Sequence, residues 1–240
     1  MTPAEPNLYS HQWFEFFHVG IDRARTRQET EFICRCAPLP EFRKILDVCC
    51  GMGRHARALS NRGYSVTGID RNADVIAKAR ELAGGRSYVV ANIRDYQPAP
   101  ETFDAAIMLG QSFGHFDDGT NRAVLRRLAD GVRKSGRVIL DLWNPDFFAS
   151  HQGARELKTA RGVVKENKRM DGDRLRVQLA YPDGDPEEFE WQLFTPPKMI
   201  SLAQSVGLAL LLSCTDFSST ITPSPAKPRI QFVFERSGKG

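Results

Sequence analysis

The sequence lacks the features that mark membrane, secreted and nucleic-acid-binding proteins. No apolar stretch approaches the roughly 20 residues that span a bilayer, and no run of five or more basic residues occurs in the chain. A net charge of +4 over 240 residues is slight, so the composition gives little electrostatic reason to expect a nucleic-acid partner. The first residues show no basic segment followed by an apolar one. We therefore expect a cytoplasmic protein without a secretory signal or a membrane partner.

Cysteine is sparse, and five cysteines cannot form a complete disulfide framework. Cys49 and Cys50 are adjacent, so a bond between them would be strained, and Cys34 and Cys36 form a C-x-C pair. Structural zinc sites more often contain pairs of ligands separated by two to four residues. We interpret the cysteines as small buried hydrophobic residues in a reducing compartment, and we expect no metal.

Short apolar runs alternate with helical patterns in the first part of the chain. The apolar runs expected to form strands are residues 44–50, 64–70, 86–92, 103–110 and 137–143, and the helices between them are expected at residues 54–62, 73–82 and 121–134. Glycine, asparagine and aspartate bound the runs, which is typical of βαβ units. The pattern predicts an α/β fold with a doubly wound, mostly parallel sheet and helices on both of its faces.

The periodicity changes after Asp146. Three runs then alternate apolar with polar residues, and turns rich in glycine and aspartate separate them. This alternation predicts an inserted antiparallel β meander with one solvated face. A helix at residues 197–206 and strands at residues 208–214 and 229–235 return the chain to the α/β pattern.

These patterns predict a single domain with a cap and an insertion. The domain covers residues 1–240, with an N-terminal helical cap at 1–40, a ligand-binding core at 41–150 and 196–240, and the β insertion at 151–195. Tyr9, Trp13 and Phe17 of the cap share one helical face. An aromatic stripe at this spacing favours burial against the rest of the protein.

The stretch ILDVCCGMGRHA, residues 45–56, places a glycine-containing turn between an apolar strand and a helix. Such a turn suits a dinucleotide or S-adenosylmethionine (SAM), because both ligands approach the backbone closely where Gly51 and Gly53 stand. Asp70 ends the second apolar run, where it suits the ribose diol of either ligand. The turn alone therefore leaves both ligands open.

Three further features favour SAM. Asp47 precedes the turn, where a carboxylate would repel the pyrophosphate of a nicotinamide cofactor but attract the ammonium group of SAM. None of the five tyrosines has a lysine four residues later, as a short-chain nicotinamide oxidoreductase would need. The helix and two strands after the fifth apolar run fit a seven-stranded sheet with an antiparallel last strand.

The chain resembles class I SAM-dependent methyltransferases over essentially its whole length. The family motif E/D-x-G-x-G-x-G lies on Asp47 to Gly53, with Cys49 where the first glycine is usual. The resemblance implies a Rossmann-like fold that binds SAM, releases S-adenosylhomocysteine and needs no metal. The cofactor-binding residues that it implies are Tyr9, Trp13, Arg25, Asp47, Cys49, Gly51, Gly53, Asp70, Arg71, Asn92, Ile93, Leu109, Gly110 and Gln111.

The resemblance also gives several of these residues a role. Asp70 would bind the ribose hydroxyls, and the amide oxygen of Asn92 would accept a hydrogen bond from the adenine amino group. The backbone of Ile93 would meet the adenine ring, and Arg25 would meet the SAM carboxylate. The N-terminal aromatic residues would form a lid that excludes water from the cofactor.

The segment GQSFGHF, residues 110–116, resembles the SFGYF or SVGYL run of small-molecule methyltransferases, including amino-sugar N,N-dimethyltransferases. His115 stands where that run has tyrosine, and it is a candidate general base because histidine titrates near neutrality. Gln111 and Trp143 are further catalytic candidates around the acceptor. Asn144-Pro-Asp-Phe resembles the NPPY-type motif of amide and nucleobase N-methyltransferases, but it follows the fifth apolar run instead of the fourth.

The predicted function is in-line transfer of a methyl group from SAM to a nitrogen or oxygen of a small-molecule acceptor. The enzyme is expected to be a monomer or a homodimer that binds no nucleic acid. The sequence leaves open an RNA or protein methyltransferase, a SAM-binding protein without catalysis, and a nicotinamide-dependent oxidoreductase.

Overall fold

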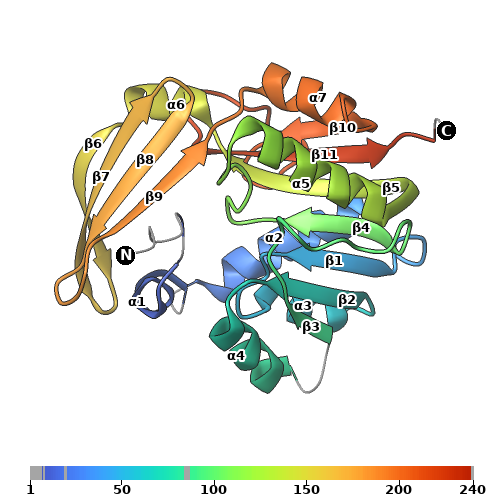
Figure 1. Cartoon of the computed structure of the whole chain (residues 1–240), viewed down its shortest axis with the longest axis horizontal. Helices are drawn as coiled ribbons and strands as arrows, with labels where there is room; N and C mark the ends of the chain where they lie inside the picture. Colours follow the sequence, from blue (N-terminus) through green and yellow to red (C-terminus); the bar gives the residue numbers. More distant parts are fainter. Residues whose placement is uncertain (1–6, 8, 19–20, 84–86, 239–240) are drawn as a thin grey trace.

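A seven-stranded sheet forms the centre of the protein (Figure 1). The computed structural model describes all residues except 1–6, 8, 19–20, 84–86 and 239–240. The strands are β1 (Lys44–Val48), β2 (Ser65–Asp70), β3 (Ser87–Val90), β4 (Phe103–Met108), β5 (Val132–Trp143), β10 (Leu208–Cys214) and β11 (Arg229–Arg236). Their order is β10-β11-β5-β4-β1-β2-β3, and β11 is antiparallel to both neighbours. This confirms the predicted Rossmann-like sheet with an antiparallel last strand.

Helices cover both faces of the sheet, as the doubly wound pattern predicts. Helices α2 (Arg23–Cys36), α3 (Arg54–Ser60) and α4 (Ala73–Ala83) lie on one face, and α5 (Asp118–Gly131) and α7 (Pro196–Gln204) lie on the other. Successive residues of β4 pack into the two hydrophobic cores, one on each face of the sheet. Ala105 and Ile107 pack on the side of α2, α3 and α4, and Ala106 and Met108 pack on the side of α5 and α7. A strand buried on both faces needs a continuous apolar run, which is the pattern that the sequence shows here.

A second, four-stranded antiparallel sheet follows α6 (Pro145–Ser150). It consists of β6 (Gly153–Thr159), β7 (Gly162–Asp171), β8 (Arg174–Ala180) and β9 (Glu187–Gln192), in that order. The meander prediction contained three strands and missed β6. The sequence GARELKT has almost no apolar alternation, because most of its side chains are exposed. Pairing with β7 defines this edge strand.

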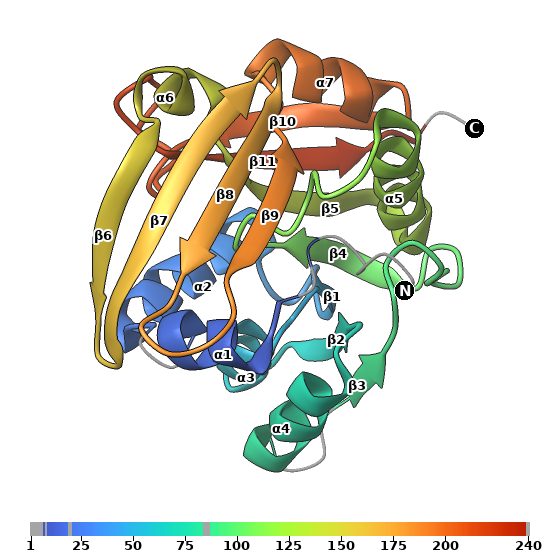
Figure 2. The same cartoon turned by 60° about the vertical axis from the view of Figure 1, so that its left-hand side comes forward.

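The four-stranded sheet stands opposite the carboxyl ends of the parallel strands (Figures 1 and 2). The N-terminal segment contains α1 (His11–Trp13) and the π-helix η1 (Phe14–His18). Its aromatic side chains pack against the apolar face of the small sheet. The carboxyl edge of the main sheet is therefore enclosed by two segments that are far apart in sequence.

Helix α5 and strand β5 both begin earlier than the sequence pattern predicts. Asp117 caps α5, because its carboxylate accepts a hydrogen bond from Thr120 N at 2.9 Å. The helix then ends at Gly131, and Val132 already pairs with Phe103 of β4. Local periodicity does not show this pairing. No helix in the described parts of the chain is long and apolar enough to cross a membrane.

Candidate functional site at the carboxyl edge of the main sheet

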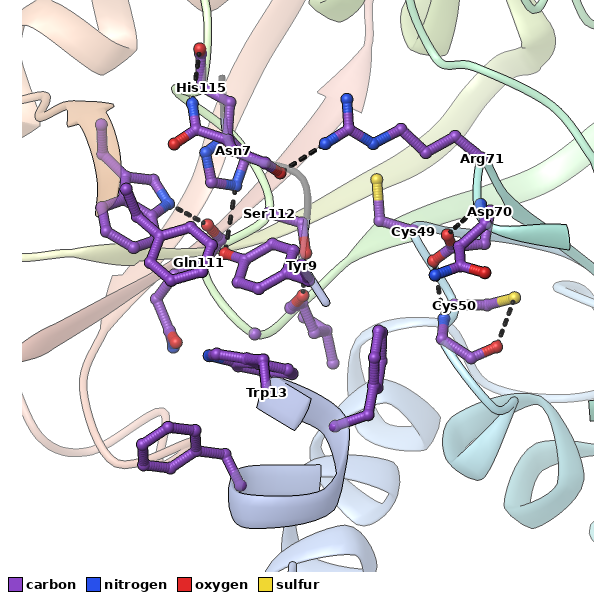
Figure 3. Close-up of a pocket in the computed structure, with 18 of the residues that line it drawn as sticks. Asn7, Tyr9, Trp13, Cys49, Cys50, Asp70, Arg71, Gln111, Ser112 and His115 are labelled. Atoms are coloured by element: carbon purple, nitrogen blue, oxygen red, sulfur yellow. Dashed lines mark hydrogen bonds between the residues drawn. The ribbon is translucent and has the colours of Figure 1, made fainter. Parts of the chain in front are cut away.

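A cavity of about 530 Å³ lies between the carboxyl edge of the main sheet, the N-terminal segment and the small sheet. Its size falls in the range of ordinary small-molecule sites. The sequence-predicted site residues that line it are Tyr9, Trp13, Arg25, Asp47, Cys49, Gly51, Asp70, Arg71, Asn92, Ile93, Leu109, Gly110, Gln111, His115 and Trp143. Figure 3 shows how several of these side chains converge from different elements. Of the predicted residues, Gly53 is outside this lining.

The turn after β1 depends on three residues with left-handed backbone conformation. Gly51 has φ 54° and Gly53 has φ 73°, which glycine adopts without steric cost. Cys49 also has a positive φ, of 55°. Cys49 therefore has the backbone conformation expected of the glycine that is usual at this position. This conformation is strained for cysteine, because a side chain disfavours the left-handed region by about 1–2 kcal/mol.

A protein contact is a second reason, besides its positive φ, for glycine at position 53. A Cβ atom at this position would lie 2.3 Å from the hydroxyl oxygen of Tyr88. Tyr88, a residue of β3, therefore occupies the space that a side chain at position 53 would need.

Asp70 connects the end of β2 with the turn. One carboxylate oxygen, Oδ2, accepts a hydrogen bond from Gly51 N at 3.0 Å, and Oδ1 accepts one from Asn72 N at 3.0 Å. Burial raises the pKa of the carboxyl group, and these backbone hydrogen bonds oppose the rise. A carboxylate has about four acceptor positions, so Asp70 retains capacity for a ribose diol.

Asp47 lies in the cavity wall with an unsatisfied oxygen. The residue is 1% exposed, and Oδ2 has no hydrogen-bond partner among the described residues. Burial raises the pKa of this carboxyl group to about 7, and the positive charge of Arg54 opposes the rise. A buried acceptor without a partner is costly. A ligand ammonium group would supply the missing donor and counter-charge.

Three arginines (Arg25, Arg54 and Arg229) and one histidine surround Glu29 beside this carboxylate. Arg25 Nε donates to Glu29 at 3.1 Å, His55 Nε2 lies 2.9 Å from Glu29, and Arg54 donates to the same carboxylate. Burial alone would raise the pKa of Glu29, but the hydrogen bond from His55 and the charge of Arg54 hold it well below its usual range. Arg25 and Arg54 thus bring positive charge to the cavity, which suits a ligand carboxylate. Arg54 and His55 were not predicted.

The adenine contact expected of Asn92 is constrained by a local hydrogen bond. Its amide oxygen accepts from Arg94 N at 3.0 Å and from Arg94 Nε at 3.4 Å. An adenine amino group would have to share that oxygen or displace the Arg94 side chain. Ile93 is buried beside it and lines the same end of the cavity.

Asp141 fixes the loop after β4 from outside the cavity. Its Oδ2 accepts from Gly110 N at 3.0 Å and from Gln111 Nε2 at 2.9 Å. Arg229 and Gln231 of β11 donate to the same carboxylate. The side chain of Gln111, a catalytic candidate in the sequence, is therefore engaged in holding its own loop.

The N-terminal segment closes the cavity through Asn7, Tyr9 and Trp13 (Figure 3). Asn7 donates to His115 O at 3.2 Å and accepts from Glu190 N at 2.7 Å. The Tyr9 ring stacks on Phe189 of β9 with centroids 4.6 Å apart. These contacts join the segment to the loop after β4 and to the small sheet, which is the arrangement of a lid.

His115 faces the lid within the cavity wall. Its Nε2 lies 3.4 Å from the hydroxyl oxygen of Tyr9. Burial lowers the pKa of His115 to about 4, with a smaller lowering from Arg71 and an opposing effect of the Glu190 backbone. The expectation that it titrates near neutrality is not supported. The imidazole is neutral at pH 7, when it is a weak base and a hydrogen-bonding group.

The small sheet supplies wall residues that sequence patterns did not identify. They are Arg155, Leu157, Glu166, Lys168, Val177, Leu179, Phe189 and Trp191. Trp191 Nε1 donates to Gln111 O at 2.9 Å and so connects β9 with the loop after β4. The only sequence signal was the presence of Glu166 and Lys168 at positions that should be apolar in the alternating pattern.

Asn144 has a structural role that accounts for the Asn144-Pro-Asp-Phe motif. Its side-chain oxygen caps α6 by accepting from Asp146 N at 3.1 Å. Its amide nitrogen donates to Ser224 O and Lys227 O, each at 2.8 Å. The amide is fully used inside the protein and is 1% exposed. The resemblance to a nucleobase-methylating motif is thus accounted for by helix capping.

Comparisons with known proteins find methyltransferases among the proteins that are similar to this chain. Residues 45–136 match the model of the methyltransferase domain family. The chain is 25% identical over 227 residues to the glycine/sarcosine N-methyltransferase of Aphanothece halophytica, covering 88% of this chain and 85% of that enzyme. It is 28% identical to the dTDP-3-amino-3,6-dideoxy-alpha-D-glucopyranose N,N-dimethyltransferase of Streptomyces fradiae, over 62% of this chain and 60% of that enzyme.

Solved structures support the fold assignment. A crystal structure of an S-adenosylmethionine-dependent methyltransferase from Clostridium acetobutylicum superposes with a TM-score of 0.80 at 15% identity, covering 95% of this chain and 97% of that one. The described residues contain no group of three or more His, Cys, Asp or Glu side chains that could hold a metal ion.

Proposed function

We propose that the chain is a SAM-dependent methyltransferase that transfers the methyl group to a nitrogen of a small-molecule acceptor. The observation that carries this proposal is the continuity of the cavity. One enclosed space contains Asp47 and Asp70 at the main sheet and a separate wall of aromatic and charged residues from the small sheet. Such a space can hold a cofactor and a small acceptor side by side.

The residues present fit SAM. Asp70, at the end of β2, suits the ribose hydroxyls, and the buried Asp47 oxygen that has no partner among the described residues suits the ammonium group. Arg25 and Arg54 offer positive charge for the carboxylate. When bound, SAM supplies a sulfonium methyl group that is already activated for displacement. The protein's task is then to align the acceptor and exclude water.

The lid and the small sheet perform that task. Asn7 and Tyr9 tie the N-terminal segment to the loop that carries His115 and to strand β9. A neutral His115 can accept a hydrogen bond from an acceptor amine, and the Tyr9 hydroxyl lies beside it. The amine would attack as the free base, so the methylated product carries the extra proton and loses it to solvent after it leaves the cavity.

A nitrogen acceptor is favoured by the relatives. Their names specify N-methylation of glycine and sarcosine and N,N-dimethylation of an amino sugar. An RNA or protein substrate fits less well, because the lid and the small sheet enclose the acceptor part of the cavity. We therefore place the protein among small-molecule N-methyltransferases.

A turnover assay tests the proposal. The purified protein would be incubated with SAM and pairs of compounds that differ only in an amine or a hydroxyl group, and S-adenosylhomocysteine would be measured. The amine members should be methylated and the alcohols should not. Methylation of the alcohols alone would refute the nitrogen proposal.

A further inference from the structure

Two charged side chains interrupt the apolar inner face of the small sheet. Strand β7 alternates exposed and buried positions, and Val164, Glu166 and Lys168 occupy the buried ones. The Glu166 and Lys168 side chains are each 8% exposed. Their neighbours on this face are apolar or aromatic, including Val177, Leu179 and Phe189.

The burial of Glu166 and Lys168 needs an explanation, because moving a charged group out of water costs free energy. Lys168 Nζ donates to Glu166 Oε2 at 2.8 Å, and Arg155 of β6 donates to the same oxygen. Desolvation of such a pair often exceeds its Coulombic attraction, so well-packed apolar residues of similar size would stabilise the fold at least as well. Local departures from the pattern that stabilises a fold are expected at functional or strained sites.

The three side chains leave an excess of positive charge in the cavity wall. Arg155 and Lys168 are cationic, and Glu166 is the single anion between them. Lys168 has three N–H donors, and its one hydrogen bond to a described residue goes to Glu166. Its ammonium group also lies 5.8 Å from the Trp143 ring centroid and 5.4 Å from that of Phe148.

A buried N–H donor with no partner among the described residues lies beside Lys168. Trp143 Nε1 is buried and has no hydrogen-bond partner among the described residues. Trp143 lines the same cavity as Lys168. Trp143 and Lys168 therefore offer unused N–H donors to whatever occupies this part of the cavity, and both would be satisfied by an oxygen acceptor.

An aromatic wall connects these donors with His115. The ring centroids of His115 and Trp191 are 5.1 Å apart, and those of Trp191 and Trp143 are 6.4 Å apart. Lys168 then stands over Trp143. An acceptor lying along this wall would have one end near His115 and the other at the donors of the small sheet.

We propose that Lys168 and Trp143, supported by Arg155, form a subsite for a carboxylate group of the methyl acceptor. The excess of one positive charge matches the single charge of a carboxylate better than the nearly double charge of a phosphate monoester. This inference rests on the proposed function, and it narrows the acceptor to an amine that also carries a carboxylate. It separates this protein from relatives whose named acceptor is a nucleotide-linked amino sugar.

Binding of simple probes tests the subsite without requiring turnover. The full chain would be titrated with phenylacetate, its neutral amide phenylacetamide, and phenyl phosphate, with and without S-adenosylhomocysteine. The chain has three tryptophans, so three indole N–H signals report on binding by NMR, and Trp143→Phe assigns one of them. Phenylacetate should shift the Trp143 signal and bind at least about tenfold more tightly than the amide, as expected for a charge-assisted hydrogen bond.

Variants separate the subsite from general packing. Lys168→Met should weaken phenylacetate binding by about tenfold or more and leave the amide unchanged, whereas Lys168→Arg should retain most of the preference. Lys165→Met is the matched control, because Lys165 is the exposed lysine on the same strand. If Lys168→Met fails to fold, the three ligands on the unmodified protein still give the answer.

The outcomes are distinct. Phenylacetate that binds no tighter than phenylacetamide, or that binds less tightly than phenyl phosphate, overturns the subsite, and so does Lys168→Met with an unchanged preference. A carboxylate preference in a protein that fails to bind S-adenosylhomocysteine would retain the subsite and refute the proposed function. A protein that binds S-adenosylhomocysteine but does not prefer phenylacetate over phenylacetamide would refute the subsite and retain the proposed function.

Discussion

Gly51 N donates a hydrogen bond to Asp70 Oδ2 at 3.0 Å, so the turn after β1 and the end of β2 hold each other in place. The two residues are 19 positions apart in the sequence. The contact orients the carboxylate and fixes the left-handed turn at the same time. A cofactor that meets Asp70 therefore meets a group whose position the turn has already set.

Removing this carboxylate should weaken cofactor binding. Asp70→Ala removes the ribose acceptor and the partner of Gly51 N, and we expect SAM affinity to fall by about 10- to 100-fold, the range for losing charge-assisted hydrogen bonds. Titration calorimetry measures the change. Asp74→Ala is the control, because Asp74 is exposed on α4 and outside the cavity lining. Equal effects of the two variants would contradict the assignment of Asp70.

Position 49 should tolerate glycine better than a β-branched residue. Cys49→Gly relieves the cost of a side chain at φ 55° and should keep stability within about 1 kcal/mol and retain cofactor binding. Cys49→Val should destabilise the protein by about 2 kcal/mol, because β-branched residues disfavour this conformation strongly. Chemical denaturation gives both values. If the glycine variant lost SAM binding, the thiol would have a role of its own.

Cofactor affinity should rise with pH around neutrality. Burial raises the pKa of Asp47 to about 7 in the ligand-free protein. Below that pH the carboxyl group is protonated and neutral, so its attraction for the ammonium group is lost. Above it, the carboxylate is present and binding reaches a plateau. Calorimetric titrations at several pH values should show the rise, and Asp47→Asn should remove the component centred near pH 7.

The raised pKa of Asp47 also predicts how the stability of the ligand-free protein depends on pH. The pKa of Asp47 is raised in the folded protein above its unfolded value, so the ligand-free protein should lose stability as pH rises toward 7. The Asp47→Asn variant should lack this contribution. A variant with an unchanged pH dependence of both stability and binding would contradict the assignment.

His115 should not produce an inflection of kcat near pH 6.5. Its pKa is lowered to about 4 by burial, so the ring stays neutral over the range in which the enzyme would be assayed. His115→Ala removes the hydrogen-bonding group beside Tyr9 and should lower kcat by about tenfold, a typical effect of losing one positioned hydrogen bond. A wild-type inflection near pH 6.5 that disappears in His115→Gln would instead identify His115 as a general base.

Asp141 should be important for stability. It is fully buried and accepts hydrogen bonds from Gln111, Arg229 and Gln231. Asp141→Ala leaves the Arg229 guanidinium without its main counter-charge, and we expect a loss of about 3 kcal/mol or more in the free energy of unfolding. Asp146→Ala, at an exposed position on α6, should change stability by less than about 0.5 kcal/mol. Comparable losses would show that the buried network contributes little.

The sequence predicted the parts of the site that are set by local chain geometry. Asp47, Gly51 and Asp70 stand at the ends of apolar runs, and parallel strands bring such ends to one edge of the sheet. The antiparallel last strand was predicted for a similar reason, since one helix and two strands remained after the fifth run.

The parts that sequence reasoning missed depend on contacts between distant segments. The bond from Trp191 to Gln111 spans 80 positions, and that from Arg229 to Asp141 spans 88. Neither hydrogen bond is reflected in a periodic pattern of the sequence. The low pKa of His115 also comes from burial beneath an N-terminal segment more than 100 positions away.

The most direct test of the central claim is calorimetric titration of the purified protein with S-adenosylhomocysteine and, separately, with NAD. We predict saturable binding of S-adenosylhomocysteine with one site per chain and no binding of NAD. Binding of NAD with no response to S-adenosylhomocysteine would contradict the cofactor assignment and the roles of Asp47 and Asp70 that depend on it.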